Sequence, residues 1–160
     1  MKLILNVLAV ALFSVTATFA QAAINSENGI AIDGYDVVSY FDGTAKKGNN
    51  ALSSMYKGTT FYFSAKNNLE KFKSTPEKFI PSYGGYCAYA VAVKGKKVSV
   101  NPETFEIRDG KLLLFYNKRS TNTLELWQNE NPEELVKKAD TNWKKIVSKY
   151  FNLYWLVKFN

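Results

Sequence analysis

The 160-residue sequence contains no histidine and a single cysteine, Cys87. The missing histidine excludes Ser-His-Asp and Cys-His nucleophilic pairs, and it removes the commonest transition-metal ligand in proteins. One cysteine cannot form a disulfide within the chain, so the stability of the fold has to come from its core. Methionine is scarce as well, with only Met1 and Met55, so a copper site would have few soft ligands.

The first 22 residues have the composition of an export signal. Lys2 supplies a basic start, the segment 3–12 is almost entirely apolar, and Ala20-Gln21-Ala22 matches the small-x-small cleavage pattern. We predict cleavage after Ala22, or after Ala20, and therefore a periplasmic or secreted protein. The alternative is an uncleaved anchor, but the apolar run is near the lower limit of about 17 residues for a membrane span.

The rest of the chain has the composition of one basic globular domain. Hydrophobic residues make up 46% and aromatic residues 15%, and the formal net charge is +7. The leader carries Lys2 and no acid, so its removal lowers this charge by one, to +6. The lysines cluster at 94–97 and 137–149, which indicates a solvated face or a weak attraction to anionic lipid or cell-wall polymer. An exported protein without interleaved aromatic motifs is not expected to bind nucleic acid.

Turn residues and periodicity predict the secondary structure. Lys57-Gly58 and Asp109-Gly110 each lie between β-rich runs and predict two hairpins. Helices are predicted over Ala65 to Phe79, restarting at Pro76, and from Thr121, restarting at Asn131-Pro132. The segment Tyr35–Phe41 is too short for periodicity to decide between a helical turn and a strand.

Two segments beyond Cys87 are also predicted as strands. They are Ala88–Val93 and Lys97–Val100, separated by a basic turn at Lys94-Gly95-Lys96. Hairpins with helices at intervals predict a single α+β domain, made mostly of antiparallel hairpins packed with helices.

Several spaced motifs stand out in the sequence: Gly34-Tyr35-Asp36-Val37-Val38-Ser39-Tyr40-Phe41, Tyr56-Lys57-Gly58, Pro76-Glu77-Lys78-Phe79, Tyr83-Gly84-Gly85-Tyr86-Cys87-Ala88, Asp109-Gly110-Lys111-Leu112 and Ala139-Asp140-Thr141-Asn142-Trp143. Together they resemble the motifs of exported YHS-domain proteins over about residues 29–143. The resemblance implies a YHS-like domain at 23–143, between the leader at 1–22 and a C-terminal extension at 144–160. Most exported single-domain members of this family have no assigned activity, so the resemblance does not define a reaction.

The resemblance also bears on metal binding. The YHS domain is related to TRASH-type domains, whose metal-binding cysteines correspond to Ser39, Ser64 and Asn68 in this chain. None of these three side chains is a thiolate, and a structural zinc site needs about four good N or S ligands. The resemblance therefore implies the fold without its metal, and a metal ion at Cys87, the one soft ligand here, is the weaker alternative.

The stretch from Pro81 to Ala90 contains Cys87 and the glycine pair Gly84-Gly85. Cys87 is interpreted as a small buried residue, with a soft-metal ligand, a redox thiol or an intermolecular disulfide as alternatives. The glycines predict a turn with positive φ, or else close backbone approach to a ligand. The predicted ligand-binding residues are Cys87, Tyr35, Asp36, Tyr40, Gly84, Gly85 and Tyr86. For Asp36, a helix cap is the competing interpretation.

The extension at 144–160 is rich in aromatic and basic residues but too short to span a bilayer. Either the last helix continues into it and packs on the domain, or its aromatic residues contact a membrane surface or a partner.

The sequence thus predicts a non-catalytic exported domain that binds a small ligand, metal ion or protein near Cys87. One alternative is a redox protein or enzyme that uses the Cys87 thiolate. The other is an accessory protein tethered to a membrane or partner by its C-terminal extension.

Overall fold

The structure, a computed structural model, describes residues 24–158, with side chains described up to residue 149. The predicted leader, residues 1–22, lies outside the described residues. The first half contains β1 (Ser26–Glu27), β2 (Ile30–Ala31), η1 (Ile32–Gly34), η2 (Ser39–Asp42), β3 (Asn49–Tyr56), β4 (Thr59–Phe63), α2 (Lys66–Ser74) and α3 (Pro76–Phe79). The second half contains η3 (Ser82–Gly85), α4 (Ala88–Lys94), β5 (Asn101–Arg108), β6 (Lys111–Phe115), β7 (Asn117–Lys118), β8 (Thr121–Asn122), α5 (Thr123–Asn129) and α6 (Pro132–Lys158).

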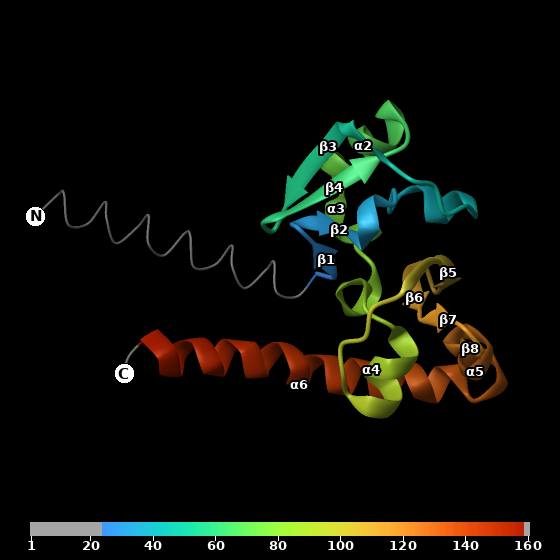
Figure 1. Ribbon diagram of the computed structural model, residues 1–160, viewed down its shortest axis with the longest axis vertical. Helices are drawn as coiled ribbons and strands as arrows, with labels where there is room; N and C mark the ends of the chain where they lie inside the picture. The colour runs from blue at the N-terminus through green and yellow to red at the C-terminus, as the bar shows by residue number, and fades with distance from the viewer. Residues whose placement is uncertain (1–23, 159–160) are drawn as a thin grey trace, which may run out of the picture.

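The predicted α+β fold class is confirmed, because helices and small sheets form one compact domain (Figure 1). The largest sheet has the strand order β1-β2-β4-β3, and its strands pair antiparallel except for the parallel pair β2 and β4. The hairpins β5-β6 and β7-β8 form two further sheets.

Both hairpins predicted from residue-Gly pairs are present. Lys57 and Gly58 join β3 to β4 with φ values of 49° and 75°, and Asp109 and Gly110 join β5 to β6 with 50° and 70°. Two successive positive φ angles match the right-handed twist of the flanking strands, which is why glycine follows Lys or Asp at these turns.

The helix restarts at the prolines are confirmed as well. Pro76 lies in the first turn of α3 and Pro132 begins α6, where the missing N–H of proline leaves no helical hydrogen bond unmade. The undecided segment Tyr35–Phe41 contributes to the 3-10 helix η2 and to no named strand, although Tyr35 makes an isolated bridge with Lys47.

The two strands predicted after Cys87 are wrong. Ala88–Lys94 forms the helix α4, which Gly95 ends in the left-handed conformation with φ 57°. Alternating alanine and valine suggested a strand, but the small alanines allow α4 to pack closely on α6 and favour a helix once that contact forms. The segment 97–100 is not a strand either, and β5 begins at Asn101.

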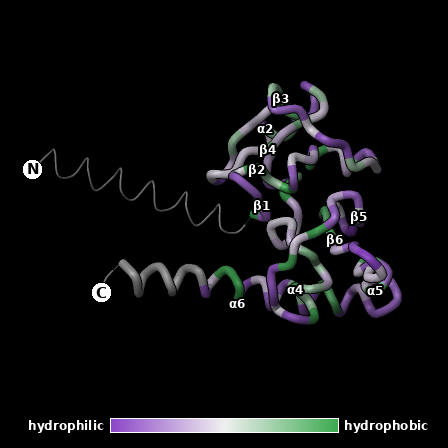
Figure 2. Tube along the Cα trace, viewed as in Figure 1, coloured by the Kyte–Doolittle hydropathy of each residue, from purple (hydrophilic) through white to green (hydrophobic). Residues whose placement is uncertain are grey.

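The core consists of two clusters that share one strand, β6. Leu112 and Leu114 belong to the first cluster, which packs β4 against α2 and the segment before η2. Leu113 and Phe115 belong to the second cluster, with Trp127 of α5 and residues of α4 and α6. Hydrophobic parts of the trace meet around α4 and β6 in Figure 2. Because successive side chains of a strand point to opposite faces, β6 lies between the two clusters and contributes residues to both.

The last helix, α6, packs its N-terminal half on α4, and Figure 1 shows its C-terminal half extending away from the domain. The helix crosses the predicted boundary between residues 143 and 144 without a break. Within residues 24–158, no helix is both long and apolar enough to cross a membrane.

Candidate functional site

The stretch from Pro81 to Ala90, called the central stretch below, begins with a tight turn, η3. This turn contacts residues 24–32, the N-terminal arm of the domain. Tyr83, Gly84 and Gly85 have φ values of 55°, 62° and 82°, in agreement with the turn predicted for the glycine pair. A Cβ atom on Gly85 would lie 2.2 Å from Cδ1 of Ile32, so any other residue there would force Ile32 to move. The backbone N–H and the side-chain amide of Asn25 donate to the carbonyls of Gly84 and Gly85, at 2.7 Å and 2.9 Å.

Cys87 is fully buried at the junction between this turn and α4. Its Sγ lies 3.3 Å from Oγ1 of Thr123, and its backbone N–H donates to the carbonyl of Val98 at 2.9 Å. A thiol with no exposed surface reacts with a solute only after the surrounding structure opens. These contacts match those expected of a packed cysteine.

Asp36 is also fully buried, but it lies among a different set of side chains. Its carboxylate accepts hydrogen bonds from the N–H groups of Val38 and Ser64, at 2.9 Å and 2.8 Å. It also accepts from the hydroxyl of Ser64 at 2.7 Å and the amide of Asn68 at 2.8 Å. Ser39 completes the group, because its hydroxyl donates to the carbonyl of Asp36 at 2.8 Å. Ser39, Ser64 and Asn68 therefore all bond to one aspartate, and we call this group the Asp36 centre.

Tyr35 and Tyr40 both reach β5 with their hydroxyl groups. The Tyr35 hydroxyl donates to Oε1 of Glu103 at 3.0 Å, and the fully buried Tyr40 donates to the carbonyl of Pro102 at 2.8 Å. Burial raises the pKa of Tyr40 far above its usual value, and burial together with Glu103 raises the pKa of Tyr35. Both hydroxyls stay protonated at neutral pH and tie the first half of the chain to β5.

The central stretch does line a groove, on the side facing α6, which we call the Trp143 groove. Its volume is about 500 Å³. The lining residues are Ile24, Tyr56, Lys57, Glu77, Ile80, Pro81, Tyr83, Gly84, Trp143 and Val147. Of the predicted ligand-binding residues, Gly84 lines this groove, whereas Cys87, Tyr35 and Asp36 do not.

Aromatic rings form the wall of the Trp143 groove. The ring of Tyr83 lies 6.2 Å from that of Trp143 at an interplanar angle of 70°, and its hydroxyl donates to Asp140 at 3.1 Å. Tyr86 also contacts Trp143, with ring centroids 6.2 Å apart. The Nζ atom of Lys97 lies 5.1 Å from the ring centroid of Tyr86 and 6.0 Å from that of Trp143. Tyr86 therefore supports the groove through Trp143.

Polar side chains line the Trp143 groove as well. The hydroxyl of Tyr56 donates to Oε1 of Glu77 at 2.7 Å, and this hydrogen bond holds the pKa of the exposed Glu77 carboxyl below its usual value. Lys57 lies with its Nζ 5.0 Å from the ring centroid of Tyr56. The groove thus offers an apolar wall, one cation and one carboxylate that stays ionised near neutral pH.

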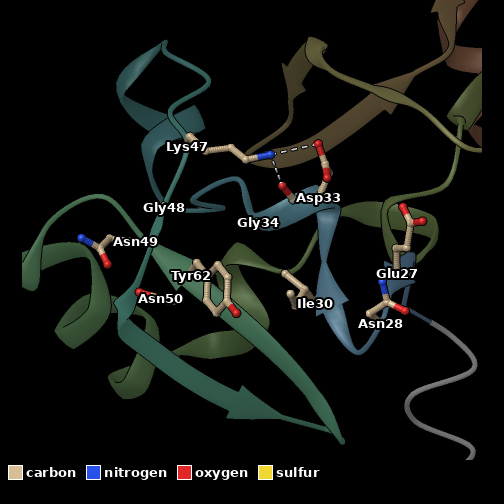
Figure 3. A pocket seen from close by; sticks show the side chains of 10 residues that line it. All are labelled: Glu27, Asn28, Ile30, Asp33, Gly34, Lys47, Gly48, Asn49, Asn50 and Tyr62. Carbon is tan, nitrogen blue, oxygen red and sulfur yellow. Dashed lines mark hydrogen bonds and ion pairs between the residues drawn. The ribbon is translucent and has the colours of Figure 1, made fainter.

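A second hollow, of about 580 Å³, lies on the N-terminal sheet, and polar or charged residues make up most of its lining (Figure 3). Nζ of Lys47 crosses its rim to Oδ2 of Asp33 at 2.9 Å and also donates to the Asp33 carbonyl. The two charges neutralise each other, and Tyr62 supplies the aromatic surface. No residue of the central stretch lines this hollow.

Nothing in the described part of the chain forms a metal site of the usual kind: residues 24–158 bring together no group of three or more His, Cys, Asp or Glu side chains that could hold an ion. No protein-family model, curated protein or solved structure matches the chain.

The Trp143 groove could not be found from the sequence. Its residues come from the N-terminal arm, the β3-β4 turn, α3, η3 and α6, which have no common motif. The segment Ala139-Asp140-Thr141-Asn142-Trp143 stands out in the sequence, but its contact with Tyr83 depends on how α6 crosses the domain.

Proposed function

We propose that this protein is a non-catalytic, exported binding domain, and that the Trp143 groove holds a small ligand with a flat apolar part. The observation that carries the proposal is the groove itself, which Pro81, Tyr83 and Gly84 of the central stretch line together with Trp143. Ligand sites are concave and mostly apolar, with a few polar groups that fix orientation. Lys57 and Glu77 are the polar groups here.

The chemistry of the groove argues against catalysis. The hydroxyl of Tyr83 has its pKa raised by burial and by Asp140, so it is a poor base at neutral pH. Glu77 has a lowered pKa and is exposed, so it is a poor general acid. Cys87, the nucleophile of the redox alternative, is buried against Thr123 and does not reach the groove.

The proposal is tested with the fluorescent probe 1-anilinonaphthalene-8-sulfonate, whose rings are flat and apolar. We expect saturable binding to one site, and Val147→Trp, which fills the groove, should weaken it at least about tenfold. Leu126→Trp adds the same ring to an exposed position on α5 and should leave binding unchanged. Lys57→Glu, which puts a negative charge in the groove lining, should weaken binding of the sulfonate several-fold.

Circular dichroism confirms that each variant keeps the fold. Equal probe binding by native protein and Val147→Trp would contradict the groove as the binding site. Loss of binding in both tryptophan variants would do the same.

We also propose that the YHS-like resemblance is real, with the metal site replaced by the Asp36 centre. The convergence of Ser39, Ser64 and Asn68 on Asp36 supports it. The triple variant Ser39→Cys, Ser64→Cys, Asn68→Cys should then bind one Zn²⁺, with Asp36 as fourth ligand. Competition with a chromogenic chelator measures this, and failure of the folded variant to take up zinc would count against the resemblance.

A further inference from the structure

We propose that the second hollow, on the N-terminal sheet, binds an uncharged saccharide whose pyranose ring lies on the side chain of Tyr62. We call this site the Tyr62 hollow. Its volume of about 580 Å³ is within the range of ligand sites, about 300–1,000 Å³. It is separate from the Trp143 groove, and the inference does not depend on the ligand proposed there.

Tyr62 lies on the outer face of β4. Along this strand the side chains at 59, 61 and 63 are buried, whereas those at 60 and 62 are only partly buried. Phe61 and Phe63 thus belong to the first core cluster, and Tyr62 does not. The Tyr62 hydroxyl has no hydrogen-bond partner among the side chains and backbone groups that the structure describes, so it is available to a ligand.

Two glycines leave the ring of Tyr62 uncovered. A Cβ atom on Gly34 would lie 3.2 Å from Cδ2 of the ring, and one on Gly48 would lie 2.4 Å from the carbonyl carbon of Tyr62. The N–H of Gly48 donates to the carbonyl of Gly34 at 2.8 Å, which joins the two glycines. Figure 3 shows the ring among the residues that line the hollow. A pyranose has a face of C–H groups, and these interact favourably with the electron-rich face of an aromatic ring.

Amide side chains supply hydrogen bonds at the Tyr62 hollow. Oδ1 of Asn49 accepts from the N–H of Ala51 at 2.9 Å, which orients the side chain and leaves its NH₂ group available. The side chains of Asn28 and Asn50 also line the hollow and have no partner among the described residues. An amide both donates and accepts, so it matches the hydroxyl groups of a sugar, which do the same.

The charge of the lining disfavours an anion. Lys47 and Asp33 form an ion pair at 2.9 Å, and Nζ of Lys47 also lies 4.7 Å from the ring centroid of Tyr35. Glu27 is the remaining charged side chain, so one lysine against two carboxylates gives the lining a net charge of −1. A phosphate or carboxylate ligand would therefore be repelled, whereas an uncharged polyhydroxylated ligand would not.

A neighbouring hollow of about 490 Å³ has similar chemistry, and Glu27 and Asp33 line both. In the neighbouring hollow, Oδ1 of Asn101 accepts from the N–H of Glu103 at 3.0 Å, and its NH₂ group is again left available. Amide groups therefore continue beyond Tyr62. A saccharide of several units should consequently bind more tightly than a single unit.

The test is a titration followed by ¹H–¹⁵N nuclear magnetic resonance, with protein that lacks the first 22 residues. The probes are cellotriose and N,N′,N″-triacetylchitotriose, which are both uncharged. We expect at least one to bind with a dissociation constant of about 1 mM or below, and the corresponding monosaccharide to bind at least about threefold more weakly. The largest shifts should be those of the backbone amides of Gly34, Gly48 and Asn50.

Variants of Tyr62 separate the ring from its hydroxyl. Tyr62→Ala should weaken binding at least about tenfold, whereas Tyr62→Phe keeps the ring and should stay within about threefold of the native protein. The matched control is Tyr116→Ala, at a partly buried tyrosine outside the hollow, which should leave binding unchanged.

A second pair of variants covers the case in which Tyr62→Ala does not fold. Asn50→Ala should weaken binding several-fold, and Asn67→Ala, at an exposed position of α2, should not. The dispersion of the amide signals shows whether each variant keeps its fold.

The absence of any shift with both trisaccharides at about 10 mM would overturn the proposal, as would equal losses in the Tyr62→Ala and Tyr116→Ala variants. Shifts centred on Gly84 would place the sugar in the Trp143 groove, which would overturn this proposal and leave that groove as a ligand site. Tighter binding of trigalacturonic acid, which carries three carboxylates, than of both uncharged probes would identify an anionic ligand instead.

Discussion

The Asp36 carboxylate is fully buried and accepts four hydrogen bonds, two from backbone N–H groups and two from side chains. An ionised carboxylate has about four acceptor sites, so the surrounding groups satisfy it. A substitution that replaces the carboxylate would leave these four donors around the side chain of residue 36. The residue thus joins the segment before η2 to the start of α2 through its own carboxylate.

Asp36→Asn should lower the free energy of unfolding by at least about 2 kcal/mol, because its amide NH₂ would face donors and leave buried groups unpaired. Urea unfolding followed by circular dichroism measures the change. The control is Asp42→Asn, at an exposed position of η2, which should cost less than about 0.5 kcal/mol. Equal effects of the two substitutions would show that the Asp36 centre adds no stability.

Buried tyrosines make the stability fall at high pH. Burial raises the pKa of Tyr40 in the folded state, so its contribution is fully present below about pH 10 and is lost as pH rises above that value, where only the unfolded state ionises. By about pH 11 this costs up to about 1.4 kcal/mol.

Tyr40→Phe is the variant that tests this. It should be about 1 kcal/mol less stable at about pH 8, because the hydrogen bond to Pro102 is lost, yet lose less stability between about pH 8 and pH 11 than the native protein. Urea unfolding at both pH values provides the comparison. Parallel losses in native and variant proteins would rule out Tyr40 as a source of the alkaline effect.

Among the elements, η3 depends most strictly on its sequence, because it turns back on the N-terminal arm through three consecutive residues with positive φ. Two constraints favour glycine at Gly85: its backbone is left-handed, and a Cβ atom there would clash with Ile32. Gly43 also has a left-handed backbone, with a φ of 79°. No atom lies within 4 Å of the place that its Cβ would take, so it has no such clash.

Gly85→Ala should therefore cost more than Gly43→Ala. Each substitution strains a left-handed backbone by about 1 kcal/mol. Gly85→Ala also forces Ile32 to move and should cost roughly 2–4 kcal/mol in all. Thermal unfolding of the two variants gives the difference directly. Equal midpoints would show that Ile32 adapts without cost.

Local chemistry explains which helices and strands could be predicted from the sequence. The hairpins at Lys57-Gly58 and Asp109-Gly110 depend on φ angles that their own residues favour, and so both predictions were correct. The helix α4 depends on α6, which packs against its alanines from about 50 residues away in the sequence, and so the alternating pattern suggested a strand. The same holds for the candidate site. The η3 turn depends on its own residues and was predictable, whereas the contact of Tyr83 with Trp143 depends on distant residues and was not.

For the whole molecule, β6 decides how the two core clusters are coupled. Leu114 and Leu113 are neighbours in sequence, both buried, and each faces a different cluster. A loss of packing on either side therefore disturbs the same strand. Cys87 lies beside this strand, since it makes a parallel bridge with Leu114.

Leu113→Ala and Leu114→Ala should each lower the free energy of unfolding by about 2–5 kcal/mol and leave one cooperative transition. Tryptophan fluorescence reports the second cluster through Trp127, while circular dichroism reports the whole chain. The Cys87 thiol should react with Ellman's reagent only in the same transition. Leu126→Ala, at an exposed position, is the control and should cost under about 1 kcal/mol. Separate transitions for the two probes would show that the clusters unfold independently.

The shared strand also sets the order in which the chain can fold during synthesis. The first cluster takes its side chains from residues 24–79 and then from Leu112 and Leu114. A chain that emerges from the ribosome N-terminus first must therefore expose the aromatic side chains of its N-terminal sheet until residue 114 has followed them. Such a nascent chain would be a substrate for chaperones for about 35 residues of elongation, or several seconds at about 5–20 residues per second.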